Sequence, residues 1–539
     1  MPRTTKRITR GRPAWSALLL VLALSAPGAA RSEDPPPPAP APAPESSSEV
    51  KRAVYVPESV KAEIRDQVKK EVLAQAKEEG WAAPNVLPKW LERFTFGGDV
   101  RVRFQNLKYP AGNANGGEFP DFAAINASAP FDVNFVDLSG EKYLNVDQDR
   151  DVFRLRARLG VDVAVAPGFT SGIRIASGET NSPVSTNQTL GASGGNFSKY
   201  QIWLDQAYIR AFTDPKARSG VMGEGGRFEN PFFTTQMIWA DAVNFDGFAL
   251  QARLGAGESL GLFLTGGAFP VFESALAFPA ELPAKFTSWN KWLFAAQVGG
   301  QWQPDPSLSL KLAVAYYDFY GIEGRISAPC DTHLKVTCST DQTRPTFAQK
   351  GNTYMALRTP SDAALVAEAL GPVPRYQYFG LPGAFQELAV TGSFLTVPFP
   401  ALSVGANAEF VWNTAFSPAT YQAVALNNRA ACDGSGCDQF AGGPYGFTGR
   451  VLLGSPLQGA QWSWSAGVEY RYLQSDAVVD AFTDPDFGLG GTNLQGYIVT
   501  GSLGIIQRVT LSLLWSSAAS IVGPRYQIDE LLVDVTARF

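Results

Sequence analysis

Hydrophobic and polar residues alternate with a period of two over most of the chain, from Phe94 to the C-terminal residue, Phe539. Such alternation is typical of β-strands with one apolar and one polar face, because successive side chains of a strand point to opposite sides. The pattern predicts sixteen strands, at 94–105, 150–165, 168–178, 200–212, 219–227, 244–254, 259–269, 292–303, 307–319, 385–397, 402–412, 444–455, 460–473, 494–504, 506–516 and 529–539.

The segments between the expected strands alternate in length. Short, turn-like connectors occur at 166–168, 213–218, 256–258, 304–306, 398–401 and 456–459, and long ones at 106–149, 179–199, 228–243, 270–291, 320–384, 413–443, 474–493 and 517–528. Outer-membrane barrels have short turns at one rim and long loops at the other, and strands of about 11 residues that span roughly 25 Å. We therefore predict an all-β fold, a transmembrane antiparallel β-barrel of about 16 strands over residues 94–539.

Three segments precede the expected barrel. Residues 1–30 combine a basic start, a short apolar stretch and small residues at Gly28–Ala30, which is the pattern of a secretory signal peptide. Residues 31–56 form a proline-rich linker. In residues 57–80, apolar residues recur every four positions up to Gly80, which predicts an amphipathic periplasmic helix. A coiled coil is the alternative for this helix.

The second expected strand places three arginines on one face. In RDVFRLRARLGVDVAV, residues 150–165, Arg154, Arg156 and Arg158 alternate with apolar residues. An arginine at mid-depth on the lipid face costs roughly 2–4 kcal/mol, so this face is expected to line the lumen. Other strands repeat the pattern, and the expected pore-wall residues are Arg101, Arg103, Arg154, Arg156, Arg158, Arg174, Arg210 and Arg227.

The third long connector is expected to fold into the barrel. Its sequence, GRFENPFFTTQMIWADAVNFDG from Gly226, is too apolar for an exposed loop tip. Its carboxylates, Glu229, Asp241 and Asp246, would then face the arginines and form a constriction with a transverse field. There are two alternatives: the loop contacts a neighbouring subunit or the rim, or the arginines only neutralise carboxylates in a plugged barrel.

The four cysteines form two close pairs. In an exported protein, local disulfides Cys330–Cys338 and Cys432–Cys437 are the simplest pairing. A zinc site that includes His333 is a weaker alternative, since no fourth ligand is evident. We expect no metal and no cofactor. His333 is the only histidine, so a Ser–His catalytic pair would depend on it, and we do not expect an enzyme.

The net charge of the chain argues against nucleic acid as a partner. The sequence has 45 Lys and Arg residues and 50 Asp and Glu residues, and the expected signal peptide contains five of the basic ones. The mature chain would therefore carry a net charge of −10, which repels polyanions. The longest apolar run, Ala17–Leu24, is too short for a membrane-spanning helix.

Several segments resemble the putative-porin family of Gram-negative outer membranes. They are AVYVPESVKAEIRDQVKKEVLAQAKEEGWAAPNVLPKWLERF, WLDQAYIR and GRFENPFF, and the likeness runs from about Val54 to Phe539. The resemblance implies an exported β-barrel pore with a short periplasmic N-terminal helix and no catalytic residues. The terminal strand, ELLVDVTARF, also resembles the signal that barrel-assembly machinery recognises, with Phe539 as its last residue.

We therefore expect a porin for passive diffusion of small hydrophilic solutes and ions, in contact with outer-membrane lipid and with the barrel-assembly machinery. A homotrimer is expected by analogy with sixteen-stranded porins. One alternative is a substrate-specific channel, either for phosphate or organic anions through the arginines or for sugars through the aromatic residues of the third connector. Another is a structural barrel whose N-terminal helix contacts the cell wall.

Overall fold

The computed structural model describes residues 67, 70–71, 90–136, 142–213, 217–430 and 439–539. The chain divides into two units, Met1–Pro84 and Asn85–Phe539, and the second contains the barrel. The expected signal peptide and linker, and the Cys432/Cys437 pair, lie outside the described residues. So does most of the expected helix 57–80, in which the described residues Gln67, Lys70 and Glu71 are helical.

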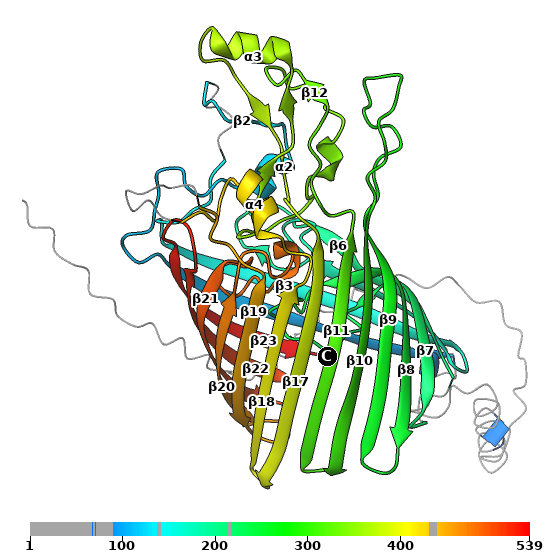
Figure 1. Cartoon of the computed structure of the whole chain (residues 1–539). Coiled ribbons are helices and arrows are strands. Elements are labelled where there is room, and N and C mark those ends of the chain that lie inside the picture. Colours follow the sequence, from blue (N-terminus) through cyan, green and yellow to red (C-terminus); the bar gives the residue numbers. More distant parts are fainter. Residues whose placement is uncertain (1–66, 68–69, 72–89, 137–141, 214–216, 431–438) are drawn as a thin grey trace, which may run out of the picture. The chain divides into compact units, whose positions relative to one another are not determined.

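Sixteen long antiparallel strands close into a barrel (Figure 1), which confirms the predicted fold. The ring closes where the first strand pairs with both the last strand and the second long one. In ring order the strands are β1 (Phe94–Lys108), β3 (Arg150–Ala166), β4 (Phe169–Ser177), β6 (Ile202–Phe212), β7 (Gly220–Glu229), β8 (Asn244–Ala256), β9 (Leu260–Phe272), β10 (Lys291–Asp305), β11 (Leu308–Tyr320), β17 (Phe385–Phe399), β18 (Leu402–Asn413), β19 (Tyr445–Gly454), β20 (Trp464–Leu473), β21 (Leu494–Ile506), β22 (Val509–Ser520) and β23 (Gln527–Arg538).

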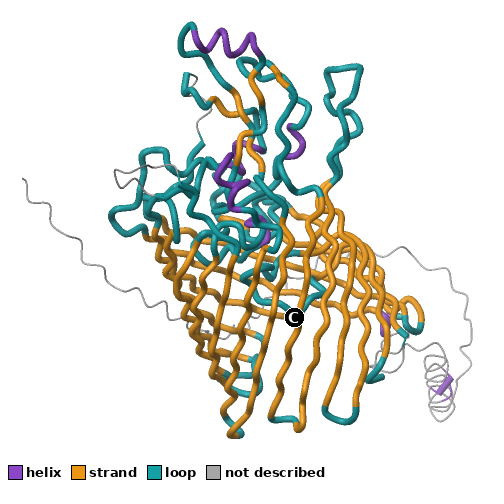
Figure 2. Tube along the Cα trace, in the orientation of Figure 1, coloured by secondary structure: helices purple, strands orange, loops and turns teal. Residues whose placement is uncertain are grey.

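Long loops gather at one end of the barrel and short turns at the other (Figure 2). Strand positions agree with the predicted ones, but several ends differ. For example, β20 begins at Trp464 rather than at residue 460, because Trp462 has a φ of 63°, which lies outside the strand region. In the described part of the chain, no helix has the length and apolarity needed to cross a membrane.

The remaining short elements lie outside the sixteen strands, η1 directly before β1 and the others in the long loops. Most of them lie beyond the barrel rim in the loop between β11 and β17 (Figure 1), which also contains the disulfide between Cys330 and Cys338. They are η1 (Leu91–Arg93), α2 (Phe122–Asn126), β2 (Phe131–Asp132), β5 (Gln188–Thr189), β12 (Pro329–Cys330), η3 (Asp341–Thr343), β13 (Met355–Ala356), β14 (Thr359–Pro360), α3 (Asp362–Ala369), β15 (Tyr376–Gln377), β16 (Phe379–Gly380), α4 (Pro418–Val424) and η4 (Asp480–Phe482).

The seam between β1 and β23 is completed by the C-terminal residue. The backbone N–H groups of Gly98 and Phe539 each donate to the other residue's carbonyl oxygen, both at 3.1 Å. A Cβ atom on Gly98 would lie 2.7 Å from the Phe539 ring and 2.3 Å from the Arg158 carbonyl oxygen. Glycine is therefore the residue that lets the terminal ring pack closely against the first strand.

Candidate pore and constriction

Five arginines form a cluster on one face of the paired strands β1 and β3. The register places Arg101 opposite Arg156 and Arg103 opposite Arg154, so like charges lie directly across from one another. Such pairs are destabilising unless carboxylates intervene. Arg158 lies opposite Asp99 at the next position of the same face. The arginine cluster, defined here as Arg101, Arg103, Arg154, Arg156 and Arg158, therefore requires anions nearby.

Three carboxylates supply most of that charge. Asp99 accepts from Arg158 Nε at 2.6 Å and from Arg156 Nε at 2.9 Å. Arg103 donates to Asp534 of β23 and, through Nη1 at 2.7 Å, to Asp486 in the loop between β20 and β21. Within the described residues, Arg154 makes no hydrogen bond or ion pair, and its Nε is buried without a partner.

Sequence reasoning missed the carboxylates that face this cluster. Asp99 stands two residues before Arg101 and four before Arg103, so the period of two already places all three side chains on one face. Asp534 likewise occupies the face opposite the apolar residues of the terminal strand. The alternation was therefore a sufficient signal for both aspartates. Asp486 lies in a long loop, where no such periodicity exists.

The other three expected pore-wall arginines also pair with carboxylates. Arg174 contacts Asp205 at 2.6 Å and Glu229 at 2.9 Å. Arg210 contacts Glu224 of the neighbouring strand at 2.8 Å. Arg227 contacts Asp246 of β8 at 2.7 Å. These groups are dispersed along β4, β6 and β7 instead of joining the cluster on β1 and β3.

The connector between β7 and β8 crosses the inside of the barrel. The Phe233 N–H donates to the side-chain amide oxygen of Gln297 in β10 at 2.8 Å, and the Phe233 carbonyl accepts from the amide nitrogen of Gln297 at 2.7 Å. Thr234 and Thr235 then donate to the Glu409 carboxylate of β18, with the Thr234 hydroxyl at 2.9 Å. Because β18 is five strands away from β8 around the ring, the loop leaves its own strands and extends through the lumen.

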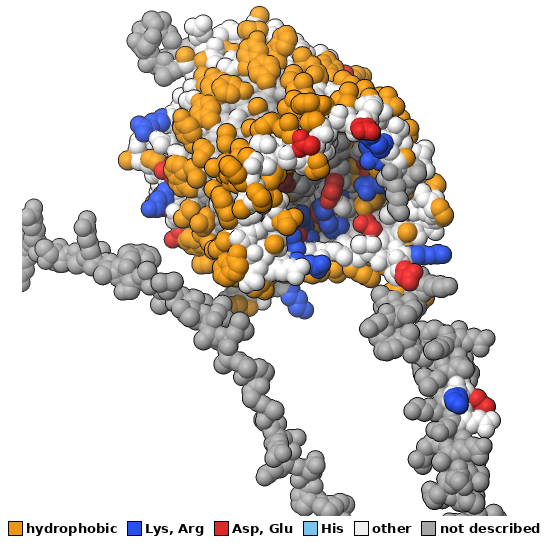
Figure 3. Space-filling model, turned by 90° about the horizontal axis from the view of Figure 1, so that it is seen from below, with side chains coloured by type: hydrophobic (Ala, Val, Ile, Leu, Met, Phe, Trp, Pro, Cys, Tyr) orange, Lys and Arg blue, Asp and Glu red, His pale blue; other side chains and the backbone are white. Residues whose placement is uncertain are grey.

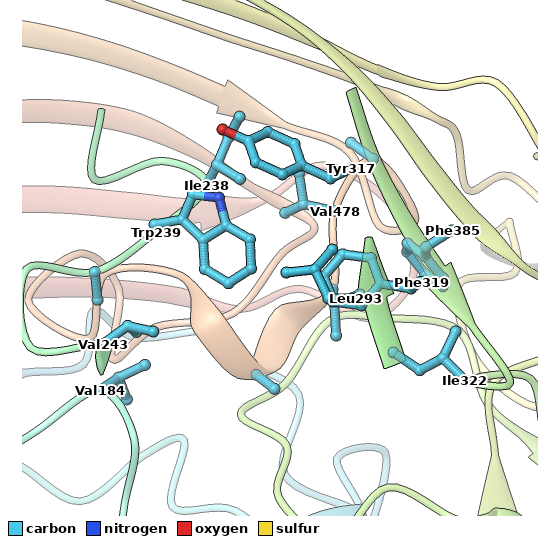
Figure 4. Close-up of a cluster of buried hydrophobic side chains, with 14 of the residues drawn as sticks. Val184, Ile238, Trp239, Val243, Leu293, Tyr317, Phe319, Ile322, Phe385 and Val478 are labelled. Atoms are coloured by element: carbon cyan, nitrogen blue, oxygen red, sulfur yellow. The ribbon is translucent and has the colours of Figure 1, made fainter. Parts of the chain in front are cut away.

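Aromatic packing holds the same loop against the wall. Trp239 is 4 % exposed and packs on Phe245 and Tyr317, with ring centroids 4.7 and 5.6 Å away. Figure 4 shows its indole beside the ring of Tyr317, within a cluster that includes Leu293 and Phe319. Burial of so many rings favours the inward course of the loop, which is too apolar to remain in water.

The three expected constriction carboxylates do not share one segment. Glu229 is the last residue of β7 and Asp246 belongs to β8, so only Asp241 lies in the connector 230–243. Strand β7 extends two residues beyond its expected end at 227, because Glu229 pairs with Asn244, whereas Asp246 lies within the expected strand 244–254. Asp241 accepts a hydrogen bond from Gln236 at 2.7 Å.

A second loop, residues 474–493, also enters the barrel. Asp484 contacts Arg471 of β20 at 3.5 Å, and Asp486 contacts Arg103 of β1. Backbone hydrogen bonds join it to the first inward loop, from Ala240 N to Phe482 O at 2.7 Å and from Asp484 N to Gln236 O at 3.2 Å. In the sequence this segment is only one of the long connectors, and no pattern in it indicates an inward course.

Contacts with the loop between β11 and β17 fix the base of the second inward loop. Thr353 donates to the Asp476 carboxylate through its N–H and hydroxyl, at 2.9 and 2.6 Å, and the Tyr354 hydroxyl donates to Asp480 at 3.2 Å. Burial raises the pKa of Asp476 to about 6 and that of Asp480 to about 7. Burial lowers the pKa of Lys350 to about 7; its ammonium group donates to the carbonyls of Gly488 and Gly490.

Cavities remain beside the inward loops. One of about 580 Å³ and another of about 330 Å³ share Arg158, Gln236, Ala240 and Asp241 in their walls. Figure 3, a view into the end with the short turns, shows a hollow with acidic and basic side chains close together and an outer surface rich in hydrophobic side chains. Charges of both signs therefore line the space that the loops leave open.

The loop cysteines are joined to each other. Cys330 and Cys338 form a disulfide with Cα atoms 6.1 Å apart. His333 lies between them, and its Nδ1 is 3.7 Å from Asp331. Because the two sulfurs are bonded to one another, neither thiolate is available as a zinc ligand in this state.

Comparison with known protein families identifies the chain. Residues 21–539 match the family described as putative porin. The chain belongs to the putative porin family. Its membership and the closed barrel support a place in the outer membrane and a role as a channel rather than as an enzyme.

Solved structures of outer-membrane barrels are similar to this porin at low identity. The outer membrane channel DcaP of Acinetobacter baumannii is 10% identical, with a TM-score of 0.36, over 83% of this chain and 97% of that one. OprB of Pseudomonas putida at high pH is 10% identical, with a TM-score of 0.40, over 84% and 96%. OmpT of Vibrio cholerae without its loop L8 is 9% identical, with a TM-score of 0.38, over 83% and 99%. No curated protein sequence matches the chain.

Proposed function

We propose that this porin forms a water-filled passage through the outer membrane for passive diffusion of small hydrophilic solutes and ions. One observation carries the proposal: the loop 230–243 crosses the lumen and leaves cavities that share Arg158 and Asp241 in their walls. An arginine wall opposite a carboxylate on a loop would produce a transverse field, and low-dielectric walls strengthen it.

The arginine cluster supports a preference for anions. It holds five guanidinium groups, and four of them contact three carboxylates, Asp99, Asp486 and Asp534. Two formal positive charges are therefore left on this wall, although the whole chain is acidic. Local charge governs the ion concentration in a narrow passage, so chloride is expected to permeate more readily than potassium.

Arg154→Gln is the sharpest test of the anion preference. Arg154 has no ionic partner among the described residues, so the substitution removes one charge from the cluster and breaks no ion pair. The reversal potential of the channel in a planar bilayer under a KCl gradient is expected to show a chloride preference that weakens in the variant by roughly fivefold at most. That ratio corresponds to the ~1 kcal/mol attraction of a unit charge at ~4 Å in water.

Arg325→Gln is the matched control, because Arg325 lies in an outer loop and pairs with Glu323 at 3.2 Å. It should leave the reversal potential unchanged. A stably folded barrel without conductance would contradict the passage itself, and an equal shift in both variants would contradict the role of the cluster.

The proposal also includes assembly into homotrimers and recognition of the terminal strand by barrel-assembly machinery. Native mass spectrometry of the solubilised porin tests the trimer.

A further inference from the structure

A cavity of about 420 Å³ has Trp239 in its wall, as does the lumen cavity of about 580 Å³. Residues of β7, β8, β9 and β10, both inward loops and the loop between β11 and β17 line it. Six aromatic side chains contribute to its wall: Trp239, Phe245, Phe269, Phe272, Phe347 and Phe482.

The composition of this wall is unusual for a route of small ions. Aromatic rings offer small anions no favourable contact, whereas binding pockets of roughly 300–1,000 Å³ combine apolar and aromatic side chains with a few convergent polar groups. The cavity falls in that size range, and its wall combines six aromatic side chains with four charged ones. It fits a solute with an apolar body that is large enough to contact several rings.

One ion pair supplies the accessible charge of the cavity. Arg227 Nη1 lies 2.7 Å from Asp246 Oδ2, and the two side chains are 30% and 52% exposed. Arg227 Nε donates to the Asp205 carbonyl. Within the described residues, Arg227 Nη2 and Asp246 Oδ1 make no hydrogen bond, so a donor and an acceptor of opposite charge remain available side by side.

The other two charged residues in the wall are already engaged. Lys291 is 3% exposed and donates to the carbonyls of Thr343 and Arg344 at 3.0 and 2.7 Å. Asp480 is 2% exposed and accepts from Tyr354. Neither offers its charge to a solute. A simple anion at Arg227 would also meet Asp246, and a simple cation at Asp246 would meet Arg227.

We propose that this cavity binds a zwitterion with an apolar side chain, that is, an apolar α-amino acid. Its carboxylate accepts from Arg227, its ammonium group donates to Asp246, and its side chain packs among the aromatic rings. Each charge of the solute then faces the opposite charge of the protein. The inference rests on the proposed passage, because it names a solute class that would enter the passage from its outer end.

The test is equilibrium binding to the full-length porin in detergent, by titration calorimetry. The probes are L-phenylalanine, 3-phenylpropanoate, which lacks the ammonium group, 2-phenylethylamine, which lacks the carboxylate, and L-alanine, which lacks the ring. Phenylalanine is expected to bind at least about tenfold more tightly than each of the others, the ratio that one lost charge-assisted contact gives.

Three variants locate the site. Thr346 is an exposed residue of the cavity wall, so Thr346→Trp should occupy the cavity and weaken phenylalanine binding about tenfold. Ala363→Trp, on the exposed surface of α3, is the matched control and should not weaken it. Asp246→Asn should weaken phenylalanine binding and strengthen that of 3-phenylpropanoate, because it removes the repulsion and keeps the arginine.

Equal binding of phenylalanine and 3-phenylpropanoate, or unchanged binding in Thr346→Trp, would overturn the proposal. KCl conductance of the same preparation in planar bilayers separates this failure from failure of the proposed function. Conductance without phenylalanine binding would support the proposed passage and contradict the proposed amino-acid site. Binding with the expected preferences but without conductance would support the amino-acid site and contradict the passage.

Discussion

At the scale of single residues, the arginine cluster depends on which guanidinium groups have a carboxylate of their own. Asp99 is 5% exposed and is the carboxylate that both Arg156 and Arg158 contact. Arg154 has no such contact within the described residues. Two changes at this cluster are therefore expected to have different effects. Loss of the Arg154 charge alters the electric field in the passage, whereas loss of the Asp99 charge lowers the stability of the barrel.

Asp99→Asn is expected to lower the free energy of unfolding by about 1–3 kcal/mol, because two arginines lose a buried charge-assisted partner while the amide oxygen still accepts. Denaturant unfolding of the barrel in lipid vesicles, followed by tryptophan fluorescence, measures the change. Glu258→Gln, in the exposed turn between β8 and β9, is a control that also removes one carboxylate. Equal stability of the two variants would show that Asp99 does not stabilise the cluster.

At the scale of the strands, the close approach of Phe539 to Gly98 offers a test of the seam. Gly98→Ala places a methyl group 2.3 Å from the Arg158 carbonyl oxygen of β3 and 2.7 Å from the Phe539 ring. Strand β1 must therefore shift relative to β3 and to the C-terminal residue. Such overpacking costs about 1–3 kcal/mol. We expect a lower temperature for loss of the compact barrel in heat-modifiability electrophoresis.

Gly449→Ala is the matched control for this seam, since Gly449 lies in β19 and a Cβ atom there meets no atom within 4 Å. It should migrate as the unaltered porin does at every temperature. If both alanine variants lose the compact form at the same temperature, the contact between β1 and the terminal ring does not limit the stability of the barrel.

The strands could be predicted from the sequence because their information is local. A period of two and short turns at regular intervals fix the strands and their inner faces, as in the alternation of Arg154, Arg156 and Arg158 with apolar residues. The inward course of residues 474–493 depends instead on Arg103 and Arg471, which lie on strands far apart in the sequence. TDPDFG reads as an exposed polar turn until those two arginines are placed around it.

At the scale of the whole barrel, the two inward loops act as one body. They share backbone hydrogen bonds, contact between Trp239 and Phe482, and a common aromatic cluster. The loop between β11 and β17 holds the second of them through Asn352, Thr353 and Tyr354. Any change that loosens this last contact is therefore expected to widen the outer part of the passage.

Deprotonation of Asp480 is such a change. Here the docked state is the one in which loop 474–493 packs against the loop between β11 and β17, and in the undocked state Asp480 is exposed to water. Burial in the docked state raises the pKa of Asp480 to about 7, above the model-compound value of 3.8. The docked loop therefore holds a proton that the undocked loop releases. Docking is therefore stronger at low pH and weakens as the pH rises toward 7, by about 1.4 kcal/mol per pH unit. Lys350, with a pKa lowered to about 7, titrates differently between the two states only above that value.

Between pH 5 and pH 6.5 Lys350 stays protonated in both states, so buried carboxyl groups cause the pH dependence, and the share of Asp480 is about 2 kcal/mol. Asp476, with a pKa raised to about 6, adds a smaller share. Amide hydrogen exchange of residues 474–493, corrected for its intrinsic pH dependence, should be slower at pH 5 than at pH 6.5. Asp480→Asn, which keeps an acceptor for Tyr354, should reduce that difference, while Asp362→Asn on α3 should not. A difference that is the same in all three proteins would place the pH dependence elsewhere and separate loop docking from the charge of Asp480.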